Sequence, residues 1–231
     1  MFLGCGGGGD ETSTAVVVPD ENANGIWSGI TTTPGFGSAD TVALFNDGDF
    51  VAINLAFGEF YKGTYTIDGD DISANLLGFE LNGPFGGTGT LTGTVTSKGT
   101  LMATVDASTG TASDVDLVYE TQAYERTITL ADLAGSWSGS APGLSFSITV
   151  DTSGAFVAIG SDGCIASGDL SIPVSNRNMI AGEISVSGAG CSVSGNYDGL
   201  GALADNLATN DVLIFGYANN DFGFAYAASR D

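Results

Sequence analysis

A short motif occurs twice in this chain, and its repetition constrains the fold more than any other sequence feature. Gly25-Ile26-Trp27-Ser28-Gly29 is followed downstream by Phe50-Val51-Ala52-Ile53, and Gly135-Ser136-Trp137-Ser138-Gly139 is followed by Phe156-Val157-Ala158-Ile159. The two tryptophans of the protein occupy the same place in both copies. The sequence therefore predicts a leader at residues 1–23 and a tandem duplication of one unit, at residues 24–125 and 126–231.

Both units show the apolar–polar alternation that is typical of β-strands, and neither shows a helical period. After the strand that carries Trp27, strands are expected at residues 41–45, 50–57, 61–67, 72–76, 89–96, 100–105 and 115–119, with a loop at 31–40. The second unit is expected to repeat them, with strands at 144–150, 156–159, 168–172, 191–195, 212–217 and 222–227. Residues 46–49 and 68–70 are expected to form hairpin turns, and residues 129–133 one helical turn.

Composition and charge exclude one class of function and favour a globular chain. Hydrophobic residues make up 43% of the sequence, which is enough to build a core. Five Lys and Arg against 27 Asp and Glu leave a net charge of −22, and there is no histidine. Because nucleic-acid binding needs clustered cations, no nucleic-acid partner is expected. The acidity itself is typical of solubility or of adaptation to salt.

The start of the chain resembles the processing site of bacterial lipoproteins. Phe2-Leu3-Gly4-Cys5 is followed by Gly6-Gly7-Gly8-Gly9-Asp10-Glu11. In that family a small residue precedes a cysteine that receives the lipid, and a polar tether follows. The resemblance implies that Cys5 is lipidated and anchors the protein to a membrane, outside the cytoplasm, in the periplasm or at the cell surface. The alternative is a cysteine in a glycine-rich leader.

With Cys5 set aside as the lipid site, Cys164 and Cys191 remain as a pair. In an oxidising compartment this pair implies a disulfide that closes a loop of about 27 residues and stabilises the fold by roughly 3 kcal/mol. Two buried free thiols are the alternative. A zinc site is not expected, because the sequence has neither CxxC spacing nor histidines.

The Gly-x-Trp motif at Gly25 and Trp27, and again at Gly135 and Trp137, resembles the signature of lipocalins and of shorter bacterial lipocalin-like lipoproteins. In that family the tryptophan closes one end of the barrel. The expected fold is therefore all-β, with two tandem antiparallel up-and-down β-barrels of about eight short strands each. This closure removes exposed strand edges. Two β-sandwiches are the alternative.

The residues available for catalysis argue against an enzyme. Without histidine the commonest general base is missing, and so are His-assisted nucleophiles and histidine metal ligands. Carboxylates fall mostly in expected turns, with no spacing that predicts a catalytic pair. Residues 46–49 and 68–71 look like fragments of calcium loops, but neither continues with the full ligand pattern. No enzyme activity, metal or cofactor is expected.

Aromatic residues supply the remaining candidate site. Most are expected to lie in the core, but Phe57, Phe60 and Tyr61 surround a turn and would form a binding patch if exposed. The expected function is a non-enzymatic envelope lipoprotein that binds or scaffolds, with a glycan, a small apolar molecule or an envelope protein as partner. A structural or adhesin-type subunit is the alternative. Because the units are small, the expectation is that side chains fill both barrels and that the surface mediates the function.

Overall fold

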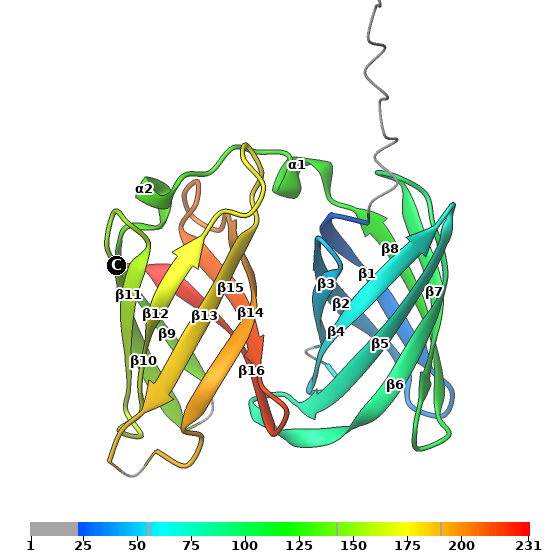
Figure 1. The fold of residues 1–231 in the computed structure, drawn as a ribbon, viewed down its shortest axis with the longest axis horizontal. Helices are drawn as coiled ribbons and strands as arrows, with labels where there is room; N and C mark the ends of the chain where they lie inside the picture. The colour runs from blue at the N-terminus through cyan, green and yellow to red at the C-terminus, as the bar shows by residue number, and fades with distance from the viewer. Residues whose placement is uncertain (1–22, 55, 142, 190) are drawn as a thin grey trace, which may run out of the picture.

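The computed structural model describes residues 23–54, 56–141, 143–189 and 191–231, and within them the chain forms sixteen strands and two short helices. The strands form two units of eight that stand side by side, joined at one end by the helices (Figure 1). The bounds in the first unit are β1 Gly25–Thr33, β2 Gly37–Asn46, β3 Asp49–Asn54, β4 Glu59–Asp68, β5 Asp71–Glu80, β6 Gly83–Val95, β7 Thr100–Ala107 and β8 Ala112–Tyr119.

The first unit is a closed antiparallel barrel. Each strand from β1 to β8 pairs with the next, and β1 also pairs with β8, so that Trp27 lies between Ala43 on one side and Tyr119 on the other. Buried side chains from strands around the barrel fill its interior. The all-β prediction and the closed eight-stranded barrel are thereby confirmed for this unit.

The turns follow the local sequence. In the hairpin between β2 and β3, Asp47 and Gly48 both have positive φ, 53° and 93°, which is the conformation that an Asp-Gly hairpin turn requires. The loop expected at residues 31–40 is wrong in its extent. There β1 continues to Thr33 and β2 starts at Gly37, because Gly35 and Gly37 at positive φ allow a tight reversal.

Two four-residue helices connect the units, α1 Thr121–Tyr124 and α2 Leu130–Leu133. The helical turn expected at residues 129–133 is confirmed. The Asp132 carboxylate accepts hydrogen bonds from the backbone N–H and the hydroxyl of Thr129, each at 2.7 Å, and so fixes the start of α2. This turn leads the chain directly into the second Gly-x-Trp motif.

The second unit contains eight further antiparallel strands. Each pairs with the next in sequence order, and β16 returns to β9 through two residue pairs. Cys191–Gly195 is not a strand, contrary to expectation: residues 192–193 form a turn, and the strand begins only at Gly195. The bounds are β9 Gly135–Ala141, β10 Leu144–Val150, β11 Ala155–Gly160, β12 Ile165–Ser171, β13 Ile180–Ser187, β14 Gly195–Ala204, β15 Val212–Ala218 and β16 Phe222–Arg230.

The two tryptophans have the same environment in both units, which supports the duplication. Both side chains are fully buried. The indole N–H of Trp27 donates to the carbonyl of Ala23 at 2.8 Å, and that of Trp137 donates to the carbonyl of Leu133 at 2.9 Å. In each unit the acceptor is the residue four positions before the tryptophan, on the segment that enters the first strand.

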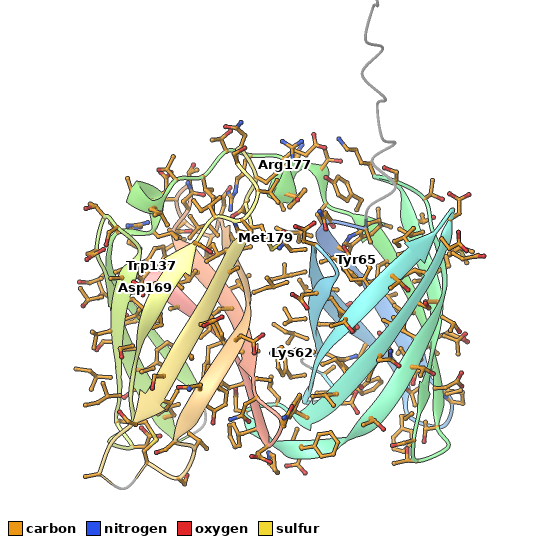
Figure 2. All side chains as sticks on the ribbon, in the orientation of Figure 1. Lys62, Tyr65, Trp137, Asp169, Arg177 and Met179 are labelled. Atoms are coloured by element: carbon orange, nitrogen blue, oxygen red, sulfur yellow. A yellow bond between two sulfur atoms is a disulfide. The ribbon has the colours of Figure 1, made fainter. Side chains whose placement is uncertain are left out.

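The units pack against each other through an apolar contact. Phe60 of β4 is fully buried. Its ring packs so closely on two glycines of the second unit that a Cβ added to Gly216 would lie 2.6 Å from the ring, and a Cβ added to Gly223 would lie 2.7 Å from it. Lys62 lies between the units (Figure 2), with its ammonium 2.5 Å from the Asp198 carboxylate. One cluster of buried residues includes side chains of both units.

Candidate ligand-binding cavity

The interior of the second unit contains a cavity of about 610 Å³. It is lined by residues from all eight strands β9–β16 and from the turns that join them at the end opposite the connecting helices (Figure 1). Its volume and its largely apolar wall are typical of a small-molecule site. The expectation that side chains fill both units is therefore wrong for the second one.

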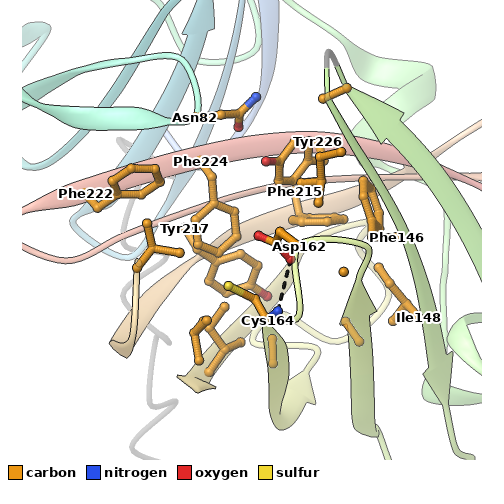
Figure 3. Close-up of a pocket in the computed structure, with 18 of the residues that line it drawn as sticks. Asn82, Phe146, Ile148, Asp162, Cys164, Phe215, Tyr217, Phe222, Phe224 and Tyr226 are labelled. Carbon is orange, nitrogen blue, oxygen red and sulfur yellow. Dashed lines mark hydrogen bonds between the residues drawn. The ribbon is translucent and has the colours of Figure 1, made fainter. Parts of the chain in front are cut away.

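One wall of the cavity is aromatic. Phe215 and Tyr217 come from β15, Phe224 and Tyr226 from β16, and Phe146 from β10 (Figure 3). The rings of Phe146 and Tyr226 have centroids 5.0 Å apart, and those of Phe224 and Tyr226 are 5.9 Å apart. Because each ring packs against another, the wall is a continuous apolar surface with fixed geometry.

Strands β11 and β12 contribute several small residues to the lining, and the duplication shows what they replace. Ala166 of β12 pairs with Ala158 of β11. In the first unit the residue in this position is Tyr61 of β4, which pairs with Ala52 of β3. Tyr61 is half-buried in the first barrel, whereas Ala166 leaves the volume of a phenol ring unoccupied.

A second replacement lies at the edge of the same space. Asn54 of β3, opposite Thr41, is buried in the first barrel, and its amide donates to the Thr41 hydroxyl at 3.3 Å. In the second unit the matching residue is Gly160, opposite Phe146. On these two strands the first unit therefore has an amide and a phenol where the second has a glycine and an alanine, while Phe146 replaces Thr41 on the neighbouring strand.

The end of the cavity towards the connecting helices is closed by core side chains. Ile148, Leu170, Ile180 and Leu213 line the cavity and also belong to the buried cluster that contains Trp137. Above them the Arg230 guanidinium lies 4.1 Å from the centre of the Trp137 ring. This layer separates the cavity from the helix end of the unit.

The open end lies at the turns that carry the exposed residues Asp162 and Ser192. Asp162 accepts a hydrogen bond from the backbone N–H of Cys164 at 3.0 Å (Figure 3). Cys164 forms a disulfide with Cys191. The expected disulfide is therefore confirmed. It joins the two turns that frame the opening.

The first unit contributes to the opening as well. Asn82, in the turn between β5 and β6, lines the cavity and has positive φ, 58°. Its side-chain oxygen accepts a hydrogen bond from the backbone N–H of Ala225 at 3.0 Å. The site thus combines the interior of the second unit with one turn of the first.

Two tyrosine hydroxyls give the cavity its polar groups. Burial raises the pKa of Tyr217, and burial together with the nearby Asp162 carboxylate raises the pKa of Tyr226. Both phenols are therefore neutral hydrogen-bond donors at physiological pH. Among the described residues, none forms a hydrogen bond with the Tyr217 hydroxyl.

The glycines of the Gly-x-Trp motifs make room beside the tryptophans. A Cβ on Gly25 would lie 2.6 Å from the Tyr119 ring, and one on Gly135 would lie 3.1 Å from the Arg230 guanidinium. Gly25, Trp27 and Trp137 therefore belong to the cores at the helix end of each unit, away from the cavity opening, whereas Gly135 is exposed beside Arg230. Cys5 lies outside the described residues.

The aromatic residues proposed as a binding patch do not form an exposed one. Phe60 is fully buried in the contact between the units, and Phe57 and Tyr61 are half-buried. The Tyr61 hydroxyl donates to the Glu59 carboxylate at 2.5 Å. The contact between the units, which the sequence pattern does not reveal, removes Phe60 from solvent.

Sequence reasoning missed the cavity, although one signal for it was present. The aromatic residues at positions 215–226 are expected in the core, and their local sequence does not indicate which side chains face them. A comparison of the two copies, position by position, would have shown Gly160 and Ala166 where the first copy has Asn54 and Tyr61.

Comparison with protein-family models, with curated proteins and with solved structures finds no match. In the described parts of the chain, no helix has the length and apolar character needed to span a membrane. The same residues contain no group of three or more Cys, Asp or Glu side chains placed to hold a metal ion.

Proposed function

We propose that the protein is a non-enzymatic binding protein of the cell envelope that holds a small apolar molecule in the cavity of its second unit. The observation that carries this proposal is the cavity of about 610 Å³, with an aromatic wall, small residues contributed by β11 and β12, and an opening to solvent. Ligand sites in proteins have volumes and linings of this kind. The first unit, whose matching interior positions carry larger side chains, serves as scaffold and supplies Asn82 to the opening.

In this proposal the second unit is a second lipocalin-like barrel. Its strands pair in unbroken order, and the β16–β9 pairs Ser229–Ser138 and Arg230–Trp137 support closure. A sandwich would need two separate sheets with unpaired edges between them. The β16–β9 pairing is the shortest strand pairing that closes the unit: it contains two residue pairs, whereas the pairings β10–β11, β9–β10 and β15–β16 contain five, seven and seven.

The location outside the cytoplasm is part of the same proposal. Lipidation at Cys5 would anchor the protein to a membrane, and the Cys164–Cys191 disulfide supports an oxidising compartment. The described chain begins at Ala23, at the helix end of the first unit (Figure 1). The cavity opens at the other end, so an anchor attached through this segment would leave the opening accessible to a ligand.

A titration with a neutral fluorescent naphthylamine, N-phenyl-1-naphthylamine, tests ligand binding. We expect saturable binding of one molecule per chain. The Ala166→Tyr variant, which restores the phenol found in the first unit, should weaken binding by about tenfold or more, or ~1.4 kcal/mol. Ser167→Tyr is the matched control, because residue 167 lies on the same strand but is exposed. Absence of saturable binding, or equal affinity in the wild-type chain and Ala166→Tyr, would refute the proposal.

A further inference from the structure

We infer that the cavity selects uncharged ligands that carry a hydroxyl group, and that it rejects carboxylates of the same size. This inference rests on the proposed function, because it concerns the chemical class of the molecule that the cavity holds. It is carried by the distribution of charge around the cavity and by one buried hydroxyl in its wall.

No positive charge lines the cavity. The chain has five Lys and Arg and no histidine, and none of the five is among the lining residues. All five lie elsewhere, in ion pairs or against rings: Lys62 with Asp198, Lys98 with Glu125, Arg126 with Asp205, Arg177 over Tyr124 and Arg230 over Trp137. A ligand carboxylate inside would therefore have no cation to compensate the loss of its hydration.

The opening adds repulsion. The Asp162 carboxylate lies over Gly160 at the edge of the cavity, where a Cβ on Gly160 would be 2.4 Å from its oxygen. The whole chain carries a net charge of −22. An anionic ligand would meet a carboxylate at the opening and a repulsive field on approach.

The interior offers a partner for a neutral polar group. Tyr217 is 3% exposed. A Cβ added to Gly182 would lie 2.8 Å from the Tyr217 hydroxyl. The Tyr217 side chain therefore packs against Gly182 and also lines the cavity, and none of the described residues forms a hydrogen bond with its hydroxyl. A ligand hydroxyl can both accept a hydrogen bond from this phenol and donate one to it.

Binding of 1-decanol and decanoate, measured by calorimetry on the full chain, tests this selectivity with two ligands of equal chain length. At pH 7.4 we expect decanoate to bind between about 10-fold and about 1,000-fold more weakly. The upper limit is the ratio of charged to uncharged acid for a carboxyl pKa of about 4.3. At pH 5.5 the uncharged fraction rises by about 75-fold on the same basis, so decanoate affinity should rise strongly while decanol affinity stays constant.

The titratable groups that line the cavity are Asp162, Tyr217 and Tyr226, since Cys164 is held in the disulfide. Of these, Asp162 is the one carboxylate, and the two phenols, whose pKa values are raised, stay neutral throughout. Asp162→Asn keeps the hydrogen-bond acceptor for the Cys164 N–H and removes the charge. It should raise decanoate affinity at pH 7.4 by several-fold, and by more than it changes decanol affinity.

Tyr217→Phe tests the buried hydroxyl. It should weaken decanol binding by about fivefold, the loss expected for one neutral hydrogen bond of ~1 kcal/mol. Tyr61→Phe, in the first unit, is the matched control and should leave decanol affinity unchanged.

The outcomes separate the inference from the proposed function. Equal or tighter binding of decanoate at pH 7.4 would overturn the selectivity while the cavity remained a ligand site. An unchanged decanol affinity in Tyr217→Phe would overturn the role of the hydroxyl, and an unchanged decanoate affinity in Asp162→Asn would overturn that of the carboxylate. If neither ligand nor the naphthylamine probe binds, the proposed function itself fails.

Discussion

Removal of the Cys164–Cys191 disulfide should lower the free energy of unfolding of the second unit by about 3.5 kcal/mol. The bridge spans 27 residues. In the chain-entropy model, a loop of this length removes about 12 cal/mol/K from the unfolded ensemble, which gives about 3.5 kcal/mol at 25 °C. The loop contains the hairpin of β12 and β13, whose seven residue pairs are independent of the bridge. The native hairpin should therefore persist when the bridge is removed.

The double substitution Cys164→Ser and Cys191→Ser can be compared with the bridged chain by urea unfolding. A Trp27→Phe background in both proteins leaves Trp137 as the reporter of the second unit alone. The bridged chain treated with reductant is the matched control and should unfold like the double variant. A difference below about 1 kcal/mol would refute the reasoning, because the unfolded loop would then already be constrained without the bridge.

The bridge also joins the two turns that frame the cavity opening, so its loss has a second expected effect. Without it, the turn at Asp162 and the turn at Ser192 are no longer linked across the opening. We expect the dissociation rate of the naphthylamine probe to increase by more than its association rate, because the bound ligand is less enclosed. Stopped-flow fluorescence of the bridged chain and the double variant measures both rates. Unchanged dissociation would show that the bridge acts on stability alone.

Three further changes test the packing and the acid response. Gly216→Val should destabilise the protein by about 1–3 kcal/mol in thermal unfolding, because a Cβ at this position would lie 2.6 Å from the Phe60 ring. Asn178→Ala should cost about 2–4 kcal/mol in urea unfolding, since this fully buried amide bonds two backbone carbonyls and one backbone N–H. The pKa of Asp205 is lowered mainly by a hydrogen bond from the backbone N–H of Asn210 and next by one from the Arg126 guanidinium. The stability that this carboxylate contributes is therefore present above about pH 4 and is lost as the pH falls through its folded-state pKa.

Each of these has its own control. Ser167→Val places the same side chain on an exposed strand position and should cost little, so an equal loss would contradict the packing argument for Gly216. Asn178→Asp retains the shape of the amide but removes its donors, and should not restore stability. Asp205→Asn should reduce the dependence of unfolding on pH below 4; an unchanged acid transition would show that this carboxylate does not contribute to it.

Local sequence determined most of the strands and turns, although strand β13 at Ile180–Ser187 is not among the expected ones. Alternating apolar residues predict a strand from a few neighbouring positions, and the Asp47-Gly48 pair predicts its hairpin because both residues readily adopt positive φ. The repeated tryptophan motif predicted two equivalent units, and the two indole hydrogen bonds are indeed equivalent. The turn at residues 192–193 was mistaken for a strand, because short alternation near Cys191 is not distinguishable from a loop by period alone.

Only the tertiary structure decided where a ligand fits. Whether a barrel is hollow depends on the summed volume of side chains that face each other across it, and these come from strands far apart in sequence. Ala166 and Gly160 matter because they line the same cavity as the rings of Phe215 and Tyr217, and these residues are about 50 positions apart in the sequence. The burial of Phe60 and the position of Asn82 at the opening likewise arise from packing between the units. Strand formation is a property of neighbouring residues, whereas an empty volume is a property of the whole enclosure.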